Sequence, residues 1–299
     1  MPEMNWQGLT MSSNNKTDPV GAIEKARTVV LQKTSDGLVR RAIQDIGRLN
    51  ADLHVAELIA KGVDVNARDK DGMTPLHFAA DEGNKAVAEL LIAKGADVNA
   101  KTTDGWTPLH RAVVRHNWAV AELLIAKSAD VKARTPEGWT PLHWAVEGYQ
   151  EDHKGVAELL IAKGADVNAK TTDGWTPLER AAFNGLPAAA ELLIAKGADV
   201  NTKGISGETP LHTAVIVGYR DMAGLLIAKG ADVNAKGNDG VTSLLFAAAK
   251  GYLDVAELLI AKGADVNAKT TDGWTPLHRA VSNDQKDVAE LLKKHGAKE

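Results

Sequence analysis

The sequence contains no cysteine and few aromatic residues. The absence of cysteine from its 299 residues excludes disulfide bonds, thiolate metal ligands and cysteine nucleophiles. Aromatic residues make up 4% of the chain, so a core must be built from Leu, Ile, Val and Ala, which suit closely packed helices. The formal net charge of −4 provides no basic surface of the kind that attracts nucleic acid. We therefore expect no nucleic-acid partner.

Long apolar runs are also missing. The first twenty residues have neither a basic start nor an apolar stretch, so no secretory signal is recognised. No apolar run approaches the roughly 18 residues that a membrane span needs. We predict a cytoplasmic protein with no membrane partner, and a non-classical route of export is left open.

What the sequence does contain is a repeat. The phrase KTTDGWTPLH occurs at 101–110, returns unchanged at 269–278, and occurs at 170–179 with Glu179 in place of the histidine. Related turn phrases begin at Asp71, Asp104, Glu137, Asp173, Ser206, Asp239 and Asp272. Their spacing is 33 residues, except that 36 residues separate the third from the fourth. A fixed period of this size is typical of a stacked array of structural repeats.

Each unit predicts a helix, a turn and a second helix. Thr74 followed by Pro75 is a helix start, because the hydroxyl can accept from an unpaired amide and proline has no amide to leave unpaired. Gly83 ends this short helix. The segment VAELLIAKG at 87–95 carries a second apolar stripe and ends in glycine, and ADVNAK then leads into the next turn.

These motifs resemble the ankyrin repeat. TPLHxAA, LLIAKGADVNA and the DGWTP turn are similar to the sequence motifs of that family, and they recur in the same register in seven copies. The resemblance implies an all-α solenoid of stacked helix-turn-helix units with projecting β-turn or hairpin fingers. A shortened copy at 55–72 precedes them, and Lys293 replaces the isoleucine of earlier units, as expected of a polar cap. The predicted segments are a disordered N-terminus at 1–21, a helical cap with a degenerate repeat at 22–70, full repeats at 71–103, 104–136, 137–172, 173–205, 206–238 and 239–271, and a capping repeat at 272–299.

One position of the repeat carries a row of histidines: His77, His110, His143, His212 and His278. A row of imidazoles suggests metal binding or acid–base chemistry. The resemblance implies instead a buried histidine that bonds to the backbone of the adjacent turn. Leu245 stands at this position in one unit and can neither bind metal nor carry a proton. Packed units lie about 10 Å apart, too far for neighbouring rings to share one zinc ion. We expect a structural role, with no metal and no cofactor.

No catalytic motif is found. The glutamates that recur in the second helices are periodic, as expected of a solvated outer face. Phosphate-binding GxxxxGK, GxSxG and HExxH are absent. The insertion at 149–153 is interpreted as idle, and a secondary contact or a change in array curvature is the alternative. Glu151, Asp152 and His153 could in principle hold a cation, but no second cluster lies nearby in the sequence to support such a site. We predict that the chain is not an enzyme.

Positions that vary between units are released from the packing constraint. The resemblance implies that partners are contacted by the turn tips and the inner face of the first helices. The candidates there combine Trp with Arg, as expected at the centre of a protein interface. They are Trp106, Arg111, Arg115, Trp139, Trp144, Trp175, Arg180, Phe183 and Trp274. The alternative is that these residues pack on neighbouring units.

The sequence thus predicts a non-catalytic interaction module that is monomeric on its own and binds a protein or peptide on its concave face. One alternative is a structural or self-associating scaffold, against which the polar caps argue. Another is a host-directed effector that acts by binding. The identity of the partner is not encoded in any one motif, because recognition is spread over many variable positions.

Overall fold

The computed structural model describes residues 51–60, 62–146 and 154–298. The predicted N-terminal disordered segment, most of the N-terminal cap and the insertion at 149–153 lie outside these residues. Within them the chain is built from helices and turns with no strand, so the predicted all-α solenoid is confirmed. The insertion's proposed cation site, which includes His153, is likewise outside the described residues.

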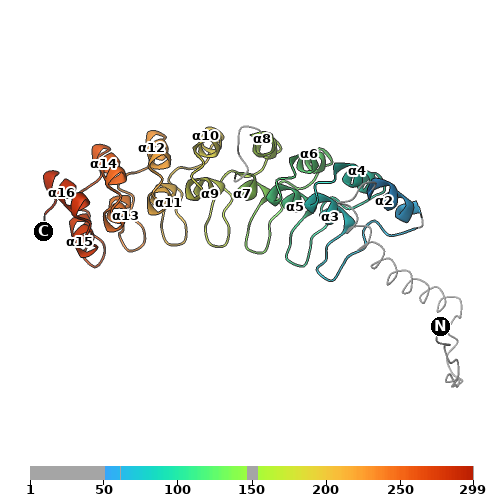
Figure 1. The fold of residues 1–299 in the computed structure, drawn as a ribbon, viewed down its shortest axis with the longest axis horizontal. Helices are drawn as coiled ribbons and strands as arrows, with labels where there is room; N and C mark the ends of the chain where they lie inside the picture. Colours follow the sequence, from blue (N-terminus) through green and yellow to red (C-terminus); the bar gives the residue numbers. More distant parts are fainter. Residues whose placement is uncertain (1–50, 61, 147–153, 299) are drawn as a thin grey trace, which may run out of the picture.

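The helices form two rows. The inner row consists of α3 (Pro75–Asp81), α5 (Pro108–Val114), α7 (Pro141–Ala145), α9 (Pro177–Phe183), α11 (Pro210–Val217), α13 (Ser243–Lys250) and α15 (Pro276–Ser282). The outer row consists of α2 (Ala51–Ala60), α4 (Lys85–Ala93), α6 (Trp118–Ala126), α8 (Lys154–Ala162), α10 (Pro187–Ala195), α12 (Arg220–Ala228), α14 (Leu253–Ala261) and α16 (Lys286–Lys294). The array is arched, with the outer helices on the convex side and the inner helices and turns on the concave side (Figure 1).

Six of the seven inner helices described start in the same way, whereas α13 begins at Ser243 without the proline or the reciprocal cap. In α5, Thr107 is the N-cap and Pro108 the first helical residue. The Thr107 hydroxyl accepts from the backbone N–H of His110, whose ring accepts from the Thr107 N–H in return. Such reciprocal caps satisfy two amides that the helix leaves unpaired, and the loss of an N-cap typically costs about 1 kcal/mol.

A continuous stripe of small and branched aliphatic residues forms the core. Inner-helix leucines such as Leu109 and Leu142 and outer-helix leucines such as Leu124 and Leu160 are fully buried. Alanines alternate with them, which lets neighbouring helices approach closely. Since each unit packs only on its neighbours, the stability of the array depends on every interface between adjacent units.

Asparagines tie the units together at the ends of the outer helices. The Asn66 side chain donates to the Gly95 carbonyl at 3.0 Å and accepts from the Asp97 N–H at 2.8 Å. The same pair of bonds recurs at Asn168, Asn201, Asn234 and Asn267. Lys132 stands at the corresponding position of its unit and has no amide to offer.

Candidate functional site

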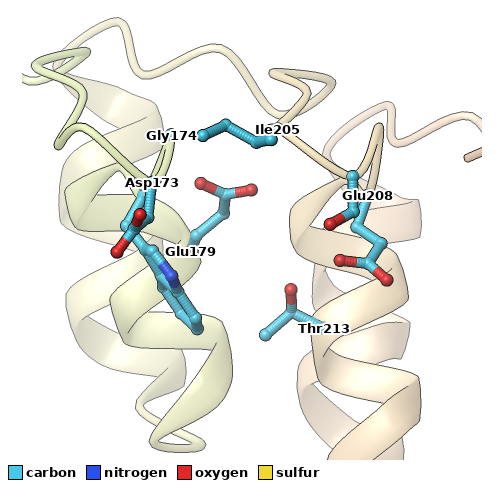
Figure 2. Close-up of a pocket in the computed structure, with 9 residues that line it drawn as sticks. Asp173, Gly174, Glu179, Ile205, Glu208 and Thr213 are labelled. Atoms are coloured by element: carbon cyan, nitrogen blue, oxygen red, sulfur yellow. The ribbon is translucent and has the colours of Figure 1, made fainter. Parts of the chain in front are cut away.

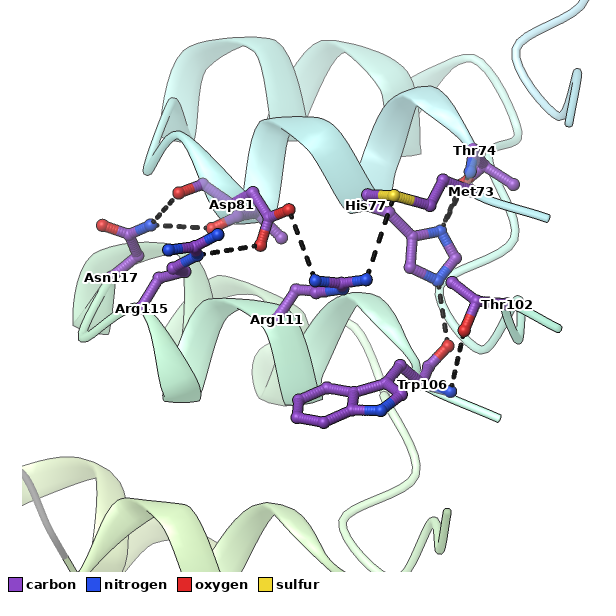
Figure 3. Close-up of polar contacts among 10 residues, drawn as sticks. Met73, Thr74, His77, Asp81, Thr102, Trp106, Arg111, Arg115 and Asn117 are labelled. Carbon is purple, nitrogen blue, oxygen red and sulfur yellow. Dashed lines mark hydrogen bonds and ion pairs between the residues drawn. The ribbon is translucent and has the colours of Figure 1, made fainter. Parts of the chain in front are cut away.

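The buried histidines connect adjacent units. The His77 ring is fully buried, its Nδ1 accepts from the Thr74 N–H at 3.1 Å, and its Nε2 lies 3.1 Å from the Trp106 carbonyl oxygen of the next unit (Figure 3). Because an amide must donate and a carbonyl must accept, the ring is a neutral imidazole with its proton on Nε2. The corresponding Nε2 contacts of His110, His143 and His212 are 3.1 to 3.3 Å long.

Burial keeps these rings uncharged. It lowers the pKa of His77, His110 and His143 from 6.5 to about 4, and it lowers the pKa of His212 as well. His278 belongs to the last unit and is exposed, and its hydrogen bonds with the described residues are made within its own helix start. In the part of the chain that the structure describes, no group of three His, Asp or Glu side chains is arranged to hold a metal ion.

Four of the predicted partner residues lie together on the concave side. We call Trp106, Trp139, Trp144 and Arg180 the tryptophan cluster. The Trp144 ring centroid lies 5.8 Å from that of Trp106 and 5.1 Å from that of Trp139. The Arg180 guanidinium lies 5.0 Å from the Trp144 centroid and 5.2 Å from the Trp139 centroid. The four side chains come from three successive units, and each is half-buried.

The cluster continues toward the N-terminal end through Arg111. Its guanidinium lies 5.4 Å from the Trp106 ring centroid (Figure 3). Both Arg111 and Arg115 pair with Asp81, at 3.8 and 3.5 Å. The sequence analysis had named Arg111 and Arg115 among the partner candidates and did not predict that they contact an acidic residue. The structure joins them through one shared carboxylate, which partly offsets their charge.

The remaining predicted residues lie outside the tryptophan cluster. Trp175 meets Phe183 edge-on at 5.5 Å, and Phe183 is 45% exposed. Trp274 is 38% exposed and lies under the Arg279 guanidinium at 4.8 Å, at the C-terminal end of the array. Arg279 was not among the predicted residues, although it occupies the same position of the repeat as Arg111.

A cavity of about 320 Å³ lies between α9 and the turn of the following unit. Its lining includes the carboxylates of Asp173, Glu179 and Glu208, together with Trp175 and Gly204 (Figure 2). Glu179 stands in the histidine position and is only 4% exposed. Burial raises the pKa of Glu179 from 4.5 to about 7, because the charged form loses hydration. The sequence analysis noted the substitution but did not predict the cavity.

The family is established by comparison with known proteins. A family model described as ankyrin repeats in three copies matches residues 42–135, 94–171, 120–204, 152–237, 198–270 and 235–299. These matches together span the chain from residue 42 to its last residue, so the chain belongs to the ankyrin repeat family. Members of this family are generally protein–protein interaction modules and typically non-catalytic. No curated protein matches the chain. None of the described helices is long and apolar enough to cross a membrane.

Proposed function

We propose that this chain is a non-catalytic module that holds a protein or peptide partner on its concave face, with the tryptophan cluster at the centre of the interface. The observation that carries the proposal is the stack of three half-buried indoles capped by a guanidinium, with contacts of 5.0 to 5.8 Å. Trp and Arg are the residues most enriched in binding hot spots. Side chains already held by one another lose little further freedom when a partner covers them.

One feature supports a binding role without catalysis, and a second argues against self-association. Both ring nitrogens of His77, and of its equivalents His110, His143 and His212, are engaged by backbone groups, so these imidazoles are not available to move protons for a substrate. The final outer helix, α16, carries Lys293 and Lys294 in its last turn. Such a charged end disfavours end-to-end stacking of copies. A monomeric state, a cytoplasmic location and the absence of a nucleic-acid partner stay predictions from the sequence.

The test uses substitutions that the array itself already contains. The double variant Trp139→Val, Trp144→Thr introduces the residues of Val241 and Thr213 at the same repeat positions, so it removes two rings with little risk to the fold. Phe246→Thr is the matched control, because it makes the equivalent aromatic-to-threonine change in a unit away from the cluster. Helicity and melting temperature are compared first.

Parent, double variant and control are then immobilised, and proteins captured from an extract of the source cells are quantified by mass spectrometry. We expect a discrete partner that the parent and the control retain and that the double variant loses at least about tenfold. A partner retained equally by all three proteins contradicts the central role of the cluster. Growth of the protein's own assemblies with concentration, without any captured partner, favours the self-associating scaffold instead.

A further inference from the structure

The cavity beside Glu179 arises where two departures from the repeat meet. In four other units a histidine donates to the next turn's carbonyl. The Trp106 oxygen, for example, accepts from both the Thr102 N–H at 2.9 Å and His77 Nε2 at 3.1 Å. The equivalent Glu208 oxygen accepts from the Gly204 N–H at 2.9 Å and receives no histidine, because Glu179 occupies that position. The Glu208 carbonyl oxygen therefore faces the cavity and can accept a second hydrogen bond there.

The Glu179 carboxylate also has an acceptor directed into this space. Its Oε2 accepts from the Thr176 N–H at 2.9 Å, and the Thr176 hydroxyl also hydrogen-bonds to the carboxyl group. A Cβ atom placed on Gly204 would lie 3.5 Å from Oε1 and 3.8 Å from the Glu208 carbonyl oxygen. Both acceptors therefore border the same empty volume, which Figure 2 shows between the two units. Four other units carry threonine at this position, as at Thr102, while Asp69 and Gly237 occupy it in two more.

The electrostatics favour a cation. The rim carries the carboxylates of Asp173 and Glu208, and no Lys or Arg is among the lining residues. The positive charge that acts on Glu179 is Lys170, whose ammonium donates to the Lys203 carbonyl at 3.1 Å. The volume of about 320 Å³ is about ten times the ~30 Å³ share of one water molecule, so an alkyl chain fits. Trp175 supplies an apolar wall on which such a chain, or the cation itself, can lie.

We propose that this cavity binds a primary ammonium group, presented as a lysine side chain of the protein partner. The ammonium donates to Glu179 Oε1 and to the Glu208 carbonyl, and the carboxylates of Asp173, Glu179 and Glu208 balance its charge. A quaternary ammonium fits less well, since it has no N–H to donate to the two acceptors. The proposal rests on the proposed function for the source of the lysine, but the site itself is testable with a small ligand.

Proton linkage supplies a signature of binding. The pKa of Glu179 is raised to about 7, so at pH 6.5 roughly three-quarters of the free protein carries the proton on this group. A cation beside the carboxylate lowers that pKa again, and binding then releases the proton. Glu208 and Lys170, which also act on Glu179, are present before and after binding and do not remove this effect.

The experiment is calorimetric titration of the folded chain with Nα-acetyl-lysine methylamide at pH 6.5, in two buffers of different ionisation enthalpy. We expect millimolar binding with release of roughly 0.7 of a proton. Glu179→Gln abolishes the proton release and weakens binding at least about tenfold. The Nε-trimethylated ligand, which keeps the charge but lacks the donors, binds the parent at least about tenfold more weakly.

A second variant distinguishes a loss of binding from a loss of folding. Gly204→Thr fills the cavity with the side chain that other units carry, leaves the carboxylate in place, and has ordinary contact distances for its Cβ. It is expected to keep or raise the melting temperature while weakening lysine binding at least about tenfold. Absence of millimolar binding to the parent, or equal binding by parent and both variants, overturns the proposal. Partner capture through the tryptophan cluster is measured separately, so either proposal can fail while the other stands.

Discussion

The buried histidine row predicts that the protein loses stability in mild acid. His110 is fully buried between the Thr107 N–H and the Trp139 carbonyl. Its pKa is lowered from 6.5 to about 4 by burial, so between these values the unfolded chain binds more protons than the folded one. The stability associated with this neutral ring is therefore present above pH 6.5 and is lost as the pH falls from 6.5 toward 4.

The size of the effect follows from the two pKa values. At pH 5 the unfolded imidazole is nearly fully protonated and the folded one hardly at all, so one such histidine costs about 2 kcal/mol relative to pH 7. His77 and His143 have the same lowered pKa. The three together cost roughly 6 kcal/mol, a large part of the ~5 to 15 kcal/mol by which folded proteins are usually stable.

The assay is urea unfolding followed by circular dichroism at pH 7 and pH 5, for the parent and for His110→Leu. Leucine is tolerated at this position, because Leu245 occupies it in another unit and is 2% exposed. The variant is less stable at pH 7, since two backbone groups lose their partner. Its further loss between pH 7 and pH 5 is expected to be smaller than the parent's by about 2 kcal/mol. Equal losses in both proteins, with equal denaturant slopes, refute the reasoning. An NMR titration of His77, His110 or His143 in the folded chain with a midpoint near pH 6.5 refutes it as well.

Three further predictions concern positions at which one unit carries a different residue from the others. Lys132→Asn restores the two side-chain hydrogen bonds that the asparagines make in other units, and urea unfolding should show a gain in stability of about 1 kcal/mol. The reverse change, Asn201→Lys, should destabilise the chain by a similar amount. Ser128 has a φ of 65° at a position where other units carry glycine, so Ser128→Gly should raise the free energy of unfolding by about 1 kcal/mol. The reverse change Gly95→Ser, at a φ of 90° with no neighbouring atom within 4 Å of an added Cβ, should lower it through the backbone conformation alone. The pKa of Glu179 is raised to about 7, so the folded chain holds its proton better than the unfolded chain and this contribution is lost as the pH rises through 7. The stability of Glu179→Gln relative to the parent should therefore increase by about 3 kcal/mol between pH 4.5 and 8, and a difference that does not change with pH contradicts the burial of this carboxylate.

Local chemistry accounts for the parts of the fold that could be predicted. A repeat of 33 residues, a Thr-Pro helix start and apolar positions at helical spacing are all encoded within one unit, and similar units must stack in similar ways. Inner helices begin as expected at Pro75 and Pro108 because the cap and the proline act within one turn of the chain. The all-α architecture and the family were therefore determined by the sequence alone.

The tryptophan cluster and the cavity were decided by the tertiary structure. The sequence analysis had placed Trp106, Trp144 and Arg180 together among the candidates on the concave face, but not their contacts with one another. The three residues come from three units, and their contacts depend on rotamers and on the angle between units. The cavity likewise requires Glu179 of one unit to face Gly204 of the next turn, and each departure is unremarkable by itself. Period and capping are local properties that a sequence records directly, whereas a surface shared by several units exists only after they have stacked.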